Sequence, residues 1–400
     1  MRALILTNEF PPEIYGGAGV HVDELTRHLR ELIELDIRTF GSASAEADGW
    51  RVRGYLPTGD TAATDERLRP MLAAFSRDLG MLADPVQADV VHVHTWYTHL
   101  AGILVRLAYG IPLALTVHSL EPLRPWKREQ LGGGYDVSSW VERTAIESAD
   151  AVIAVSRGTR EDILRLFEVP PERVHVIHNG IDPEFYRPDP GTDALARRGV
   201  DPSVPYVLFV GRITRQKGIV HLVRAIRHLD PGIGVVLCAG QPDTPEIARE
   251  VEVGVREAQA ERSNVVWIGE MVSREEVRQL YSHAAVFCCP SVYEPFGIIN
   301  LEAAACETPV VASAVGGIPE VVVDGETGLL VPVELSLDDP MRPVDPDRFE
   351  LNLAGAINAL MADASAREAM GRAGRRRAVE HFSWDSIARQ TADLYRTLLG

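Results

Sequence analysis

The sequence predicts an α/β fold built from two doubly wound, Rossmann-like domains. Its 400 residues are more than one hydrophobic core usually holds, so the length favours two domains. Short apolar runs alternate with amphipathic segments, as in βαβ units with parallel sheets. The runs expected to form strands are 3–7, 89–95, 112–118, 151–156, 206–211, 235–240, 265–269, 285–290 and 309–313. Between them, 20–32, 219–229 and 274–284 place apolar residues three and four apart, which is typical of amphipathic helices.

The alternation breaks once, at 178–205, where prolines and turn residues accumulate before a strand resumes at Tyr206. We therefore expect an N-terminal domain over 1–185 and a C-terminal domain over 200–379. The amphipathic tail, 384–399, is expected to be helical. Ligands of open parallel sheets bind at the carboxyl ends of the strands, so the two domains are expected to face a shared cleft.

Composition narrows the class of partner. Acidic side chains outnumber Lys plus Arg by 57 to 40, and the net charge of -17 disfavours nucleic acid and anionic membranes. The four cysteines show no CxxC spacing, which argues against a disulfide framework and a zinc site. Without a leader sequence or an apolar run of ~18 residues, a cytoplasmic protein is expected. The oligomeric state stays open, with a homodimer as one option.

A glycine-rich turn follows the first predicted strand. Gly16, Gly17 and Gly19 precede a helix, and together they can present backbone N–H groups and a helix N-terminus to a phosphate. A dinucleotide fingerprint requires a further glycine where Val22 stands, so NAD is disfavoured. The alternative is a tight turn that only lets the strand and the helix pack closely.

Charged residues follow two strands of the second domain. Arg212 and Lys217, in "GRITRQKG", can converge on a diphosphate, although a solvated basic loop is the alternative. In "EPFGIINLE", Glu294 and Glu302 would lie ~12 Å apart if the intervening residues are helical, so they are expected to hold different parts of one ligand. For each glutamate alone, helix capping or a surface position is the alternative. Backbone N–H groups near the expected helix start, with Pro295 in the first turn, can meet phosphate charge at Phe296, Gly297 and Ile298.

Histidines end strands of the first domain. His118 closes the expected strand 112–118 on the ligand-binding edge, where a structural role is the alternative. His92 and His94 alternate on one strand face and raise the question of a metal. Because no carboxylate or cysteine with ligand spacing lies nearby, we interpret them as core residues and expect no metal.

The motifs "YGGAG", "TVH", "HNGID", "GRITRQKG" and "EPFGIINLE" together resemble those of the retaining GT-B glycosyltransferases of family 4, which include bacterial glycogen synthase. Within that family, the stretches 9–25 and 116–142 look most like the actinobacterial subgroup of glycogen synthases, also described as α-maltose-1-phosphate synthases. The resemblance implies a GT-B fold, a C-terminal helix near 380–400 that crosses back to the first domain, ADP-glucose as donor, and neither a metal nor another cofactor.

The resemblance also implies roles for the candidate residues. Arg212 and Lys217 would bind the donor diphosphate, Glu294 the hydroxyls of the transferred sugar, and Glu302 the nucleotide ribose. His118 would lie beside the sugar, and the backbone of Gly16 and Gly17 would contact phosphate. As the C1–O bond breaks, negative charge grows on ADP, and fixed cations stabilise it. We see no base and nucleophile pair, so we expect a front-face mechanism with retention of the α configuration.

Two motifs depart from those of ordinary bacterial glycogen synthase. "IYGGA" replaces "KTGGL", and "HTWY" replaces "HDWH", which puts Thr95 and Tyr97 in place of Asp and His. These changes fit a small phosphorylated acceptor, α-glucose 1-phosphate, and leave elongation of α-1,4-glucan ends in glycogen biosynthesis open. Arg124, Lys127 and Arg128 are candidates for the acceptor phosphate, with a mobile basic loop as the alternative.

Other functions remain open from sequence alone. The same family could use GDP-mannose or another donor with a different acceptor, including a membrane lipid, although the chain has no basic amphipathic helix. A non-catalytic, two-lobed sugar-binding protein is a further alternative, for which the four charged residues of the second domain would be superfluous.

Overall fold

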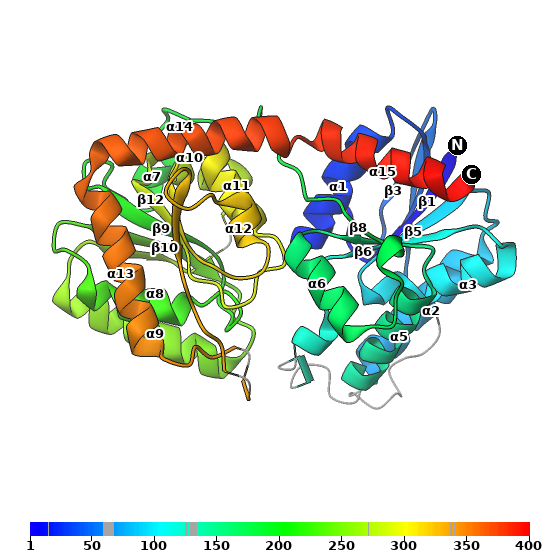
Figure 1. Ribbon diagram of the computed structural model, residues 1–400, viewed down its shortest axis with the longest axis horizontal. Helices are drawn as coiled ribbons and strands as arrows, with labels where there is room; N and C mark the ends of the chain where they lie inside the picture. Colours follow the sequence, from blue (N-terminus) through cyan, green and yellow to red (C-terminus); the bar gives the residue numbers. More distant parts are fainter. Residues whose placement is uncertain are drawn as a thin grey trace. The chain divides into compact units, whose positions relative to one another are not determined.

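The structure is a computed structural model in which two compact units are distinguished (Figure 1). It describes residues 1–14, 16–58, 68–124, 127–128, 134–270, 272–336, 338–339 and 341–400. Unit 1 comprises Met1–Gly180 and Trp384–Gly400, and unit 2 comprises Ile181–Ser383. Among the described residues, no helix combines the length and apolar character that a membrane span requires.

Unit 1 is an eight-stranded sheet with helices on both faces. The strand order is β3-β4-β2-β1-β5-β6-β7-β8, and every pair is parallel except β3 with β4. Its strands are β1 (Arg2–Thr7), β2 (Glu34–Phe40), β3 (Ser44–Ala47), β4 (Trp50–Tyr55), β5 (Val90–His94), β6 (Leu113–Val117), β7 (Ala151–Ala154) and β8 (Val174–Val176). Its helices are α1 (Gly17–Leu29), α2 (Arg69–Ala83), α3 (His99–Tyr109), α5 (Gly134–Ser148), α6 (Arg157–Leu166) and α15 (Trp384–Leu399).

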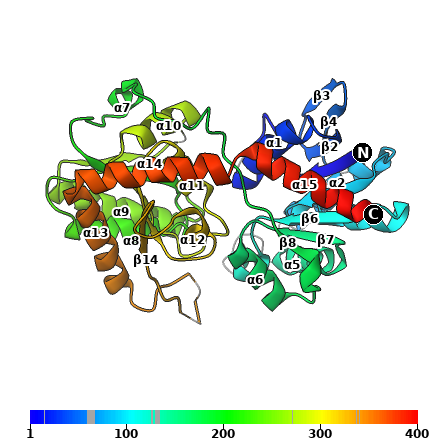
Figure 2. The same ribbon diagram turned by 45° about the horizontal axis from the view of Figure 1, so that its top comes forward.

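The C-terminal helix belongs to unit 1. Helix α15 packs beside α1, as Figures 1 and 2 show, and both bury apolar side chains against one face of the sheet. Leu25 and Leu29 of α1 and Ile387 and Tyr395 of α15 lie in this core. The opposite face carries a second core, to which α2, α3 and α5 contribute. The amphipathic helix expected over 384–399 is confirmed as α15, and the wider range 380–400 that the family resemblance implies also includes the end of α14 at His381.

Unit 2 is a six-stranded parallel sheet with the order β11-β10-β9-β12-β13-β14. Its strands are β9 (Tyr206–Arg212), β10 (Gly234–Gly240), β11 (Val265–Ile268), β12 (Val286–Cys289), β13 (Val310–Ser313) and β14 (Gly328–Val331). Its helices are α7 (Asp193–Arg197), α8 (Ile219–Ala225), α9 (Pro245–Glu261), α10 (Arg274–His283), α11 (Ile298–Ala305), α12 (Ile318–Val321), α13 (Pro346–Ala362) and α14 (Ala364–His381). Both sheets are doubly wound, and the predicted fold class is confirmed.

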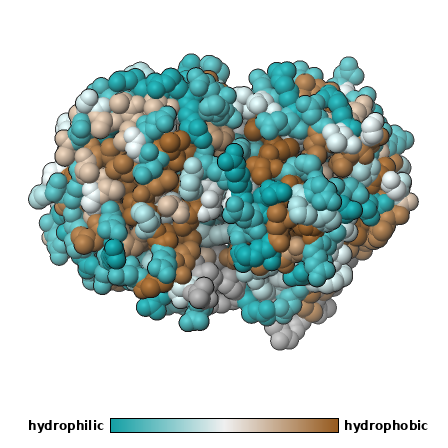
Figure 3. Space-filling view, viewed as in Figure 1, coloured by the Kyte–Doolittle hydropathy of each residue, from teal (hydrophilic) through white to brown (hydrophobic). Residues whose placement is uncertain are grey.

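The break in the sequence pattern at 178–205 coincides with the start of unit 2. Contacts divide the chain after Gly180, and the segment that follows packs within unit 2 rather than forming a free linker. Asp189 accepts hydrogen bonds from Arg278 (2.7 and 3.1 Å), and Gln279 accepts one from the backbone of Ala194. Over the visible face of each unit, hydrophilic and hydrophobic residues are interspersed (Figure 3).

Candidate active site

The strand order of unit 2 places the charged motifs around its topological switch point. Chain order reverses between the neighbouring strands β9 and β12, and in open parallel sheets ligands bind at the carboxyl end of such a point. Arg212 ends β9, Lys217 lies in the loop before α8, and Glu294 follows β12. The fold therefore brings two sequence-distant motifs to one edge.

Lys217 and Glu294 form a close ion pair at this edge. Lys217 Nζ donates to Glu294 Oε2 at 2.6 Å, and Ser291 Oγ donates to the same oxygen at 3.3 Å. The side chains are only 22% and 8% exposed. Burial disfavours the ammonium of Lys217, but the Glu294 carboxylate outweighs it and raises the Lys217 pKa above its ordinary value. Lys217 therefore keeps its ammonium at neutral pH.

Close backbone packing fixes Glu294. The carbonyl of Glu294 accepts a hydrogen bond from Gly317 N at 2.9 Å. Gly316 has φ +53°, and a Cβ at this position would lie 2.0 Å from the same carbonyl oxygen. Gly218, with φ +63°, approaches the carbonyl of Pro290 equally closely. These glycines let the loops after β9, β12 and β13 meet without side chains between them.

Arg212 has a partner that sequence reasoning missed. Its guanidinium donates to Asp243, which follows β10 in the loop before α9. The two residues are 31 positions apart, and Asp243 lies in a polar turn that shows no pattern of its own. Only the pairing of β9 with β10 indicates that they meet.

Helix α11 starts later than the sequence suggested, and this is a correction. Gly297 is its N-cap with φ +97°, so Pro295 and Phe296 lie before the helix and Ile298 is its first residue. The left-handed Gly297 interrupts any helical path from Glu294, and the expected separation along a continuous helix does not apply. The backbone N–H groups at this helix start remain candidate phosphate contacts.

Glu302 lies on α11 in a different environment from Glu294. Tyr186 OH and Tyr281 OH donate to its two carboxylate oxygens at 2.8 and 3.1 Å. Burial raises the Glu302 pKa, while the phenol hydrogen bonds and the nearby Arg274 oppose the shift. Tyr186 comes from the turn-rich segment after Gly180, so no periodic signal identified it.

In unit 1 the glycine turn lies at the sheet's own switch point, between β1 and β5. Gly16 caps α1, and its N–H donates to Glu9 Oε2 at 2.8 Å. A Cβ on Gly19 would lie 2.7 Å from the same Glu9 oxygen. The turn therefore does pack closely, and a carboxylate sits where the sequence suggested a phosphate. Gly17 is the first residue of α1.

Thr95 and Tyr97 follow β5 across this switch point. Thr95 has φ +66°, an uncommon conformation for a β-branched residue, and its Oγ1 donates to Asn8 Oδ1 at 2.7 Å. The ring of Tyr97 stacks on Trp96, with centroids 4.1 Å apart. Backbone strain of this kind clusters at functional sites, which supports keeping Thr95 as a candidate.

Four histidines of unit 1 lie close together behind this edge. His118 Nε2 and His94 Nδ1 are 3.1 Å apart, His21 Nδ1 bonds to Asn179 Oδ1 at 2.7 Å, and His92 Nδ1 bonds to Tyr395 OH at 2.5 Å. Burial lowers the pKa of each, to about 4 for His21, to about 3 for His92 and well below the ordinary value for His94 and His118. The cluster is therefore neutral at pH 7.

The candidate acceptor cations are paired rather than free. Lys127 Nζ donates to Glu121 Oε1 at 3.4 Å, and Arg124 Nη1 lies 3.8 Å from the same oxygen. Arg124 also donates to Ser119 Oγ at 3.1 Å. Burial and the charge of Arg124 lower the Lys127 pKa, and burial raises the pKa of the neighbouring Glu142 well above its ordinary value. Arg124 and Lys127 thus share one buried carboxylate, that of Glu121, whose backbone N–H donates to Glu142 Oε2 at 2.9 Å.

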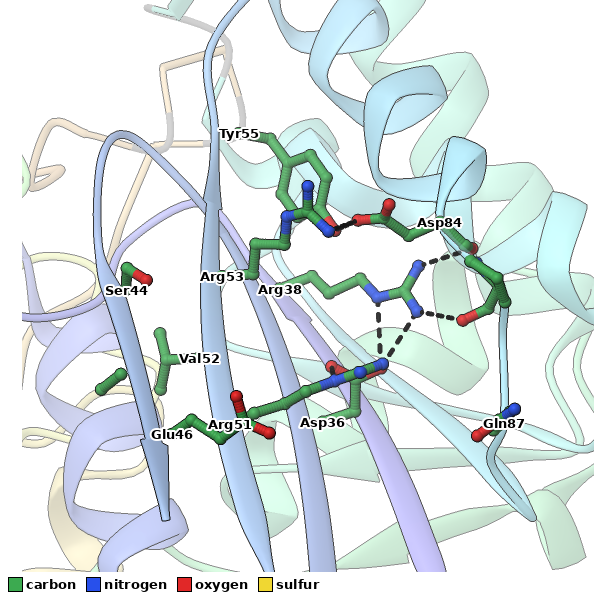
Figure 4. Close-up of a pocket in the computed structure, with 12 residues that line it drawn as sticks. Asp36, Arg38, Ser44, Glu46, Arg51, Val52, Arg53, Tyr55, Asp84 and Gln87 are labelled. Carbon is green, nitrogen blue, oxygen red and sulfur yellow. Dashed lines mark hydrogen bonds and ion pairs between the residues drawn. The ribbon is translucent and has the colours of Figure 1, made fainter.

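A pocket of about 410 Å³ lies elsewhere, on the face of β2 and β4 (Figure 4). Its guanidiniums are already matched by carboxylates. Arg38 and Arg51 both pair with Asp36, at 3.0 and 2.8 Å, and Arg53 pairs with Asp84. Burial opposes the charge of Asp36, but the two arginines hold its pKa below the ordinary value. None of the candidate site residues lines this pocket, so we do not place the active site there.

Comparison with known proteins agrees with this placement. Residues 15–185 match the family described as Glycosyltransferase Family 4, and residues 194–342 match Glycosyl transferases group 1. The chain is 53% identical over 402 residues to the α-maltose-1-phosphate synthase of Mycolicibacterium smegmatis, and 50% identical over 400 residues to that of Mycobacterium tuberculosis. Each alignment covers 99% of both chains. The D-inositol 3-phosphate glycosyltransferase of Xylanimonas cellulosilytica is 33% identical, over 95% of this chain and 91% of its own.

Solved structures show the same architecture. Sucrose-phosphate synthase from Thermosynechococcus elongatus superposes with a TM-score of 0.78 at 26% identity, covering 100% of this chain and 99% of its own. Starch synthase IV from Arabidopsis thaliana, at 19% identity and a TM-score of 0.74, shares the fold over 99% of both chains. The GT-B architecture is thus shown by both sequence and structure, and the chain belongs to the glycosyltransferase family 4 enzymes, in the branch that contains the α-maltose-1-phosphate synthases.

Proposed function

We propose that this enzyme transfers glucose from ADP-glucose to α-glucose 1-phosphate and forms α-maltose 1-phosphate with retention of configuration. The observation that carries the proposal is the identity of 53% with an α-maltose-1-phosphate synthase over 99% of both chains. The charged edge of unit 2 is chemically suited to such a donor, because a departing nucleoside diphosphate requires fixed positive charge.

The donor diphosphate is assigned to Arg212 and Lys217, and the transferred glucose to Glu294. The proposal is supported by the shared position of these residues at the β9/β12 switch point. The 2.6 Å pair means that Lys217 and Glu294 orient each other before any ligand arrives. Both cations stabilise charge that grows on the leaving group, which lets the reaction proceed without a metal ion. Glu302 is assigned to the nucleotide ribose.

The contacts of the Glu294 carboxylate support retention of configuration by a front-face mechanism. This carboxylate is engaged by an ammonium and a hydroxyl, which lowers its reactivity as a nucleophile. A donor phosphate oxygen then takes the proton of the attacking hydroxyl on the face from which ADP leaves. Neutral His118 is assigned a place beside the sugar, where an imidazole can hydrogen-bond a hydroxyl without adding charge.

The acceptor phosphate is assigned to Arg124 and Lys127. Two cations that share a single carboxylate, together with the hydroxyl of Ser119, suit a phosphate, which would replace Glu121 as the partner of both cations. Thr95 and Tyr97 are assigned to the acceptor sugar. A cytoplasmic location and a homodimeric state stay predictions from sequence, and light scattering on the purified protein tests the second.

The assay offers labelled ADP-glucose, UDP-glucose and GDP-mannose in turn, each with α-glucose 1-phosphate or glycogen as acceptor. We expect labelled maltose 1-phosphate from ADP-glucose, formed faster than any product on glycogen. Arg128 provides a matched control for the acceptor cluster, since its exposed guanidinium pairs with Asp136 instead. Arg124→Gln with Lys127→Gln is expected to raise KM for glucose 1-phosphate at least tenfold, and Arg128→Gln is expected to leave it unchanged. Transfer from GDP-mannose alone would contradict the proposal and leave the family intact.

A further inference from the structure

Three histidines of unit 1 meet at the carboxyl edge of its sheet. His21 lies in the second turn of α1, His94 ends β5 and His118 follows β6. One ring nitrogen from each lies within 4.8 Å of the others, and the ring centroids are 4.7 to 5.5 Å apart. In the sequence, no carboxylate or cysteine with ligand spacing lies near His94. The fold supplies two further imidazoles from distant segments.

The hydrogen bonds of the cluster leave a ring nitrogen of His21 available. Asn179 Oδ1 can only accept, so His21 Nδ1 carries the proton and His21 Nε2 keeps its lone pair. Within the described part of the chain, His21 Nε2 has no hydrogen-bond partner although His21 is only 3% exposed, and His94 Nδ1 and His118 Nε2 bond to each other. A histidine that donates one N–H to an oxygen and points its other nitrogen at an ion is the usual arrangement of a metal ligand.

We propose that His21, His94 and His118 form a binding site for Zn²⁺, or a similar borderline metal ion, with three imidazole ligands and an open fourth position. Zn–N bonds of about 2.0–2.1 Å in a tetrahedron place ligand nitrogens about 3.3 Å apart. His94 Nδ1 and His118 Nε2 already lie 3.1 Å apart, and the proton that they share moves to the other nitrogen of the same ring when both bind the ion. The remaining separations, at most 4.8 Å, close by roughly 1.5 Å through small side-chain rotations.

The ligand set selects the kind of ion. Imidazole nitrogens suit Zn²⁺, Cu²⁺ and Ni²⁺, whereas Mg²⁺ and Ca²⁺ require oxygen ligands. The trio contributes no carboxylate, so an anion such as hydroxide or phosphate is the expected fourth ligand. Because His118 is the partly exposed member, an ion would enter past it. Trp384 packs against His21, with ring centroids 5.3 Å apart, and limits movement on the buried side.

Occupancy of this site would inhibit sugar transfer. This consequence rests on the proposed function, in which His118 lies beside the transferred glucose. A metal ion that takes a ring nitrogen of His118 removes it from the sugar and places positive charge where an oxocarbenium-like centre forms. The site is therefore inhibitory rather than catalytic, and a chelator should restore activity.

Binding is measured first, without reference to activity. Metal-free full-length protein is equilibrated with Zn²⁺, and bound metal is quantified by elemental analysis. We expect one Zn²⁺ per chain. Co²⁺ in place of Zn²⁺ should give the visible absorption of a tetrahedral ion with nitrogen ligands. Absence of the charge-transfer band of a thiolate would exclude Cys288 and Cys289, which are neighbours on β12 of unit 2, as the binding site.

Variants assign the ligands. His21→Asn and His118→Asn should each weaken Zn²⁺ binding at least tenfold, whereas His175→Asn on β8 changes a histidine of the same unit outside the trio. Circular dichroism and Tm identify a variant that fails to fold. If one of the two ligand variants does not fold, the other still tests the site. Sub-stoichiometric zinc, or binding that both variants retain, would overturn the site while leaving the proposed function untouched. Full activity at full zinc occupancy would overturn the inhibitory role and count against the place assigned to His118.

Discussion

Replacement of Lys217 by methionine should lower both the stability of unit 2 and the rate of transfer. Met preserves much of the side-chain volume but leaves the Glu294 carboxylate, which is 8% exposed, without the ammonium 2.6 Å away. Removing one partner of a largely buried pair costs about 3 kcal/mol. For a cooperative unit of about 200 residues, at roughly 2–4 °C per kcal/mol, Tm should fall by about 6–12 °C.

The catalytic effect of Lys217→Met should be separable from the structural one. Loss of a group that stabilises leaving-group charge is expected to reduce kcat by about 100- to 1000-fold. Adding Glu294→Gln removes the unpaired carboxylate, so the double variant should recover about 2 kcal/mol of stability without recovering activity. Calorimetry and initial rates with ADP-glucose measure the two effects.

Arg215 offers a matched control for this experiment. It lies two residues from Lys217 in the same loop, is 56% exposed, and pairs with Glu250 only at 3.9 Å. Arg215→Met should change stability by less than about 0.5 kcal/mol. If Lys217→Met behaved like Arg215→Met in both Tm and kcat, the reasoning about the ion pair would be refuted.

Three further predictions concern other parts of the molecule. Gly19→Ala should displace Glu9 and destabilise unit 1 by about 1–3 kcal/mol in chemical denaturation, because the new Cβ would lie 2.7 Å from the Glu9 carboxylate; a wild-type midpoint would contradict this. His92 has its pKa lowered to about 3, so the folded state binds fewer protons than the unfolded state between the two pKa values. The contribution of His92 to stability is then full above pH 6.5 and falls by about 1.4 kcal/mol per pH unit below it, while His21, His94 and His118 add to the total slope; His92→Asn should reduce that slope in Tm measured from pH 7.5 to 5. Tyr186→Phe removes the 2.8 Å hydrogen bond to Glu302 and should destabilise unit 2 by about 1–3 kcal/mol and raise KM for the donor; an unchanged KM would argue against Glu302 at the ribose.

The cluster of Arg212, Lys217 and Glu294 could be predicted because each residue follows a strand that is recognisable in the sequence. Arg212 and Lys217 follow a buried apolar run, and Glu294 follows another, so the rule that ligands bind beyond the carboxyl ends of strands placed them together. The contact between Lys217 and Glu294 follows from the pairing of β9 with β12. Their roles in binding ADP-glucose stay predictions.

Strands that bury charged side chains were not predicted from the sequence. Strand β2 carries Asp36 and Arg38 in a run that otherwise reads as apolar, and both are buried because each is the other's partner. A hydropathy profile assigns charged residues such as Asp36 and Arg38 to the surface. In the structure they are buried and stabilised as an ion pair, with further partners from β4 and from the segment after α2. An ion pair of this kind is a tertiary property that a single sequence does not display.

Details at the ends of helices and in turns also escaped prediction. The left-handed conformation of Gly297 delays the start of α11, and Gly316 packs closely against the Glu294 backbone just before it. Glu9 occupies the N-terminus of α1, and nothing in the glycine motif distinguishes a carboxylate of the chain from the phosphate of a ligand. Tyr186 reaches Glu302 from 116 residues away.

Product analysis tests the central claim most directly. The wild-type protein is incubated with ¹³C-labelled ADP-glucose and α-glucose 1-phosphate, in the presence of a chelator, and the new anomeric carbon is examined by NMR. The account predicts an α-linked disaccharide phosphate, lost in Lys217→Met. A β-linked product, a strict requirement for added metal, or transfer that does not depend on Lys217 would contradict it.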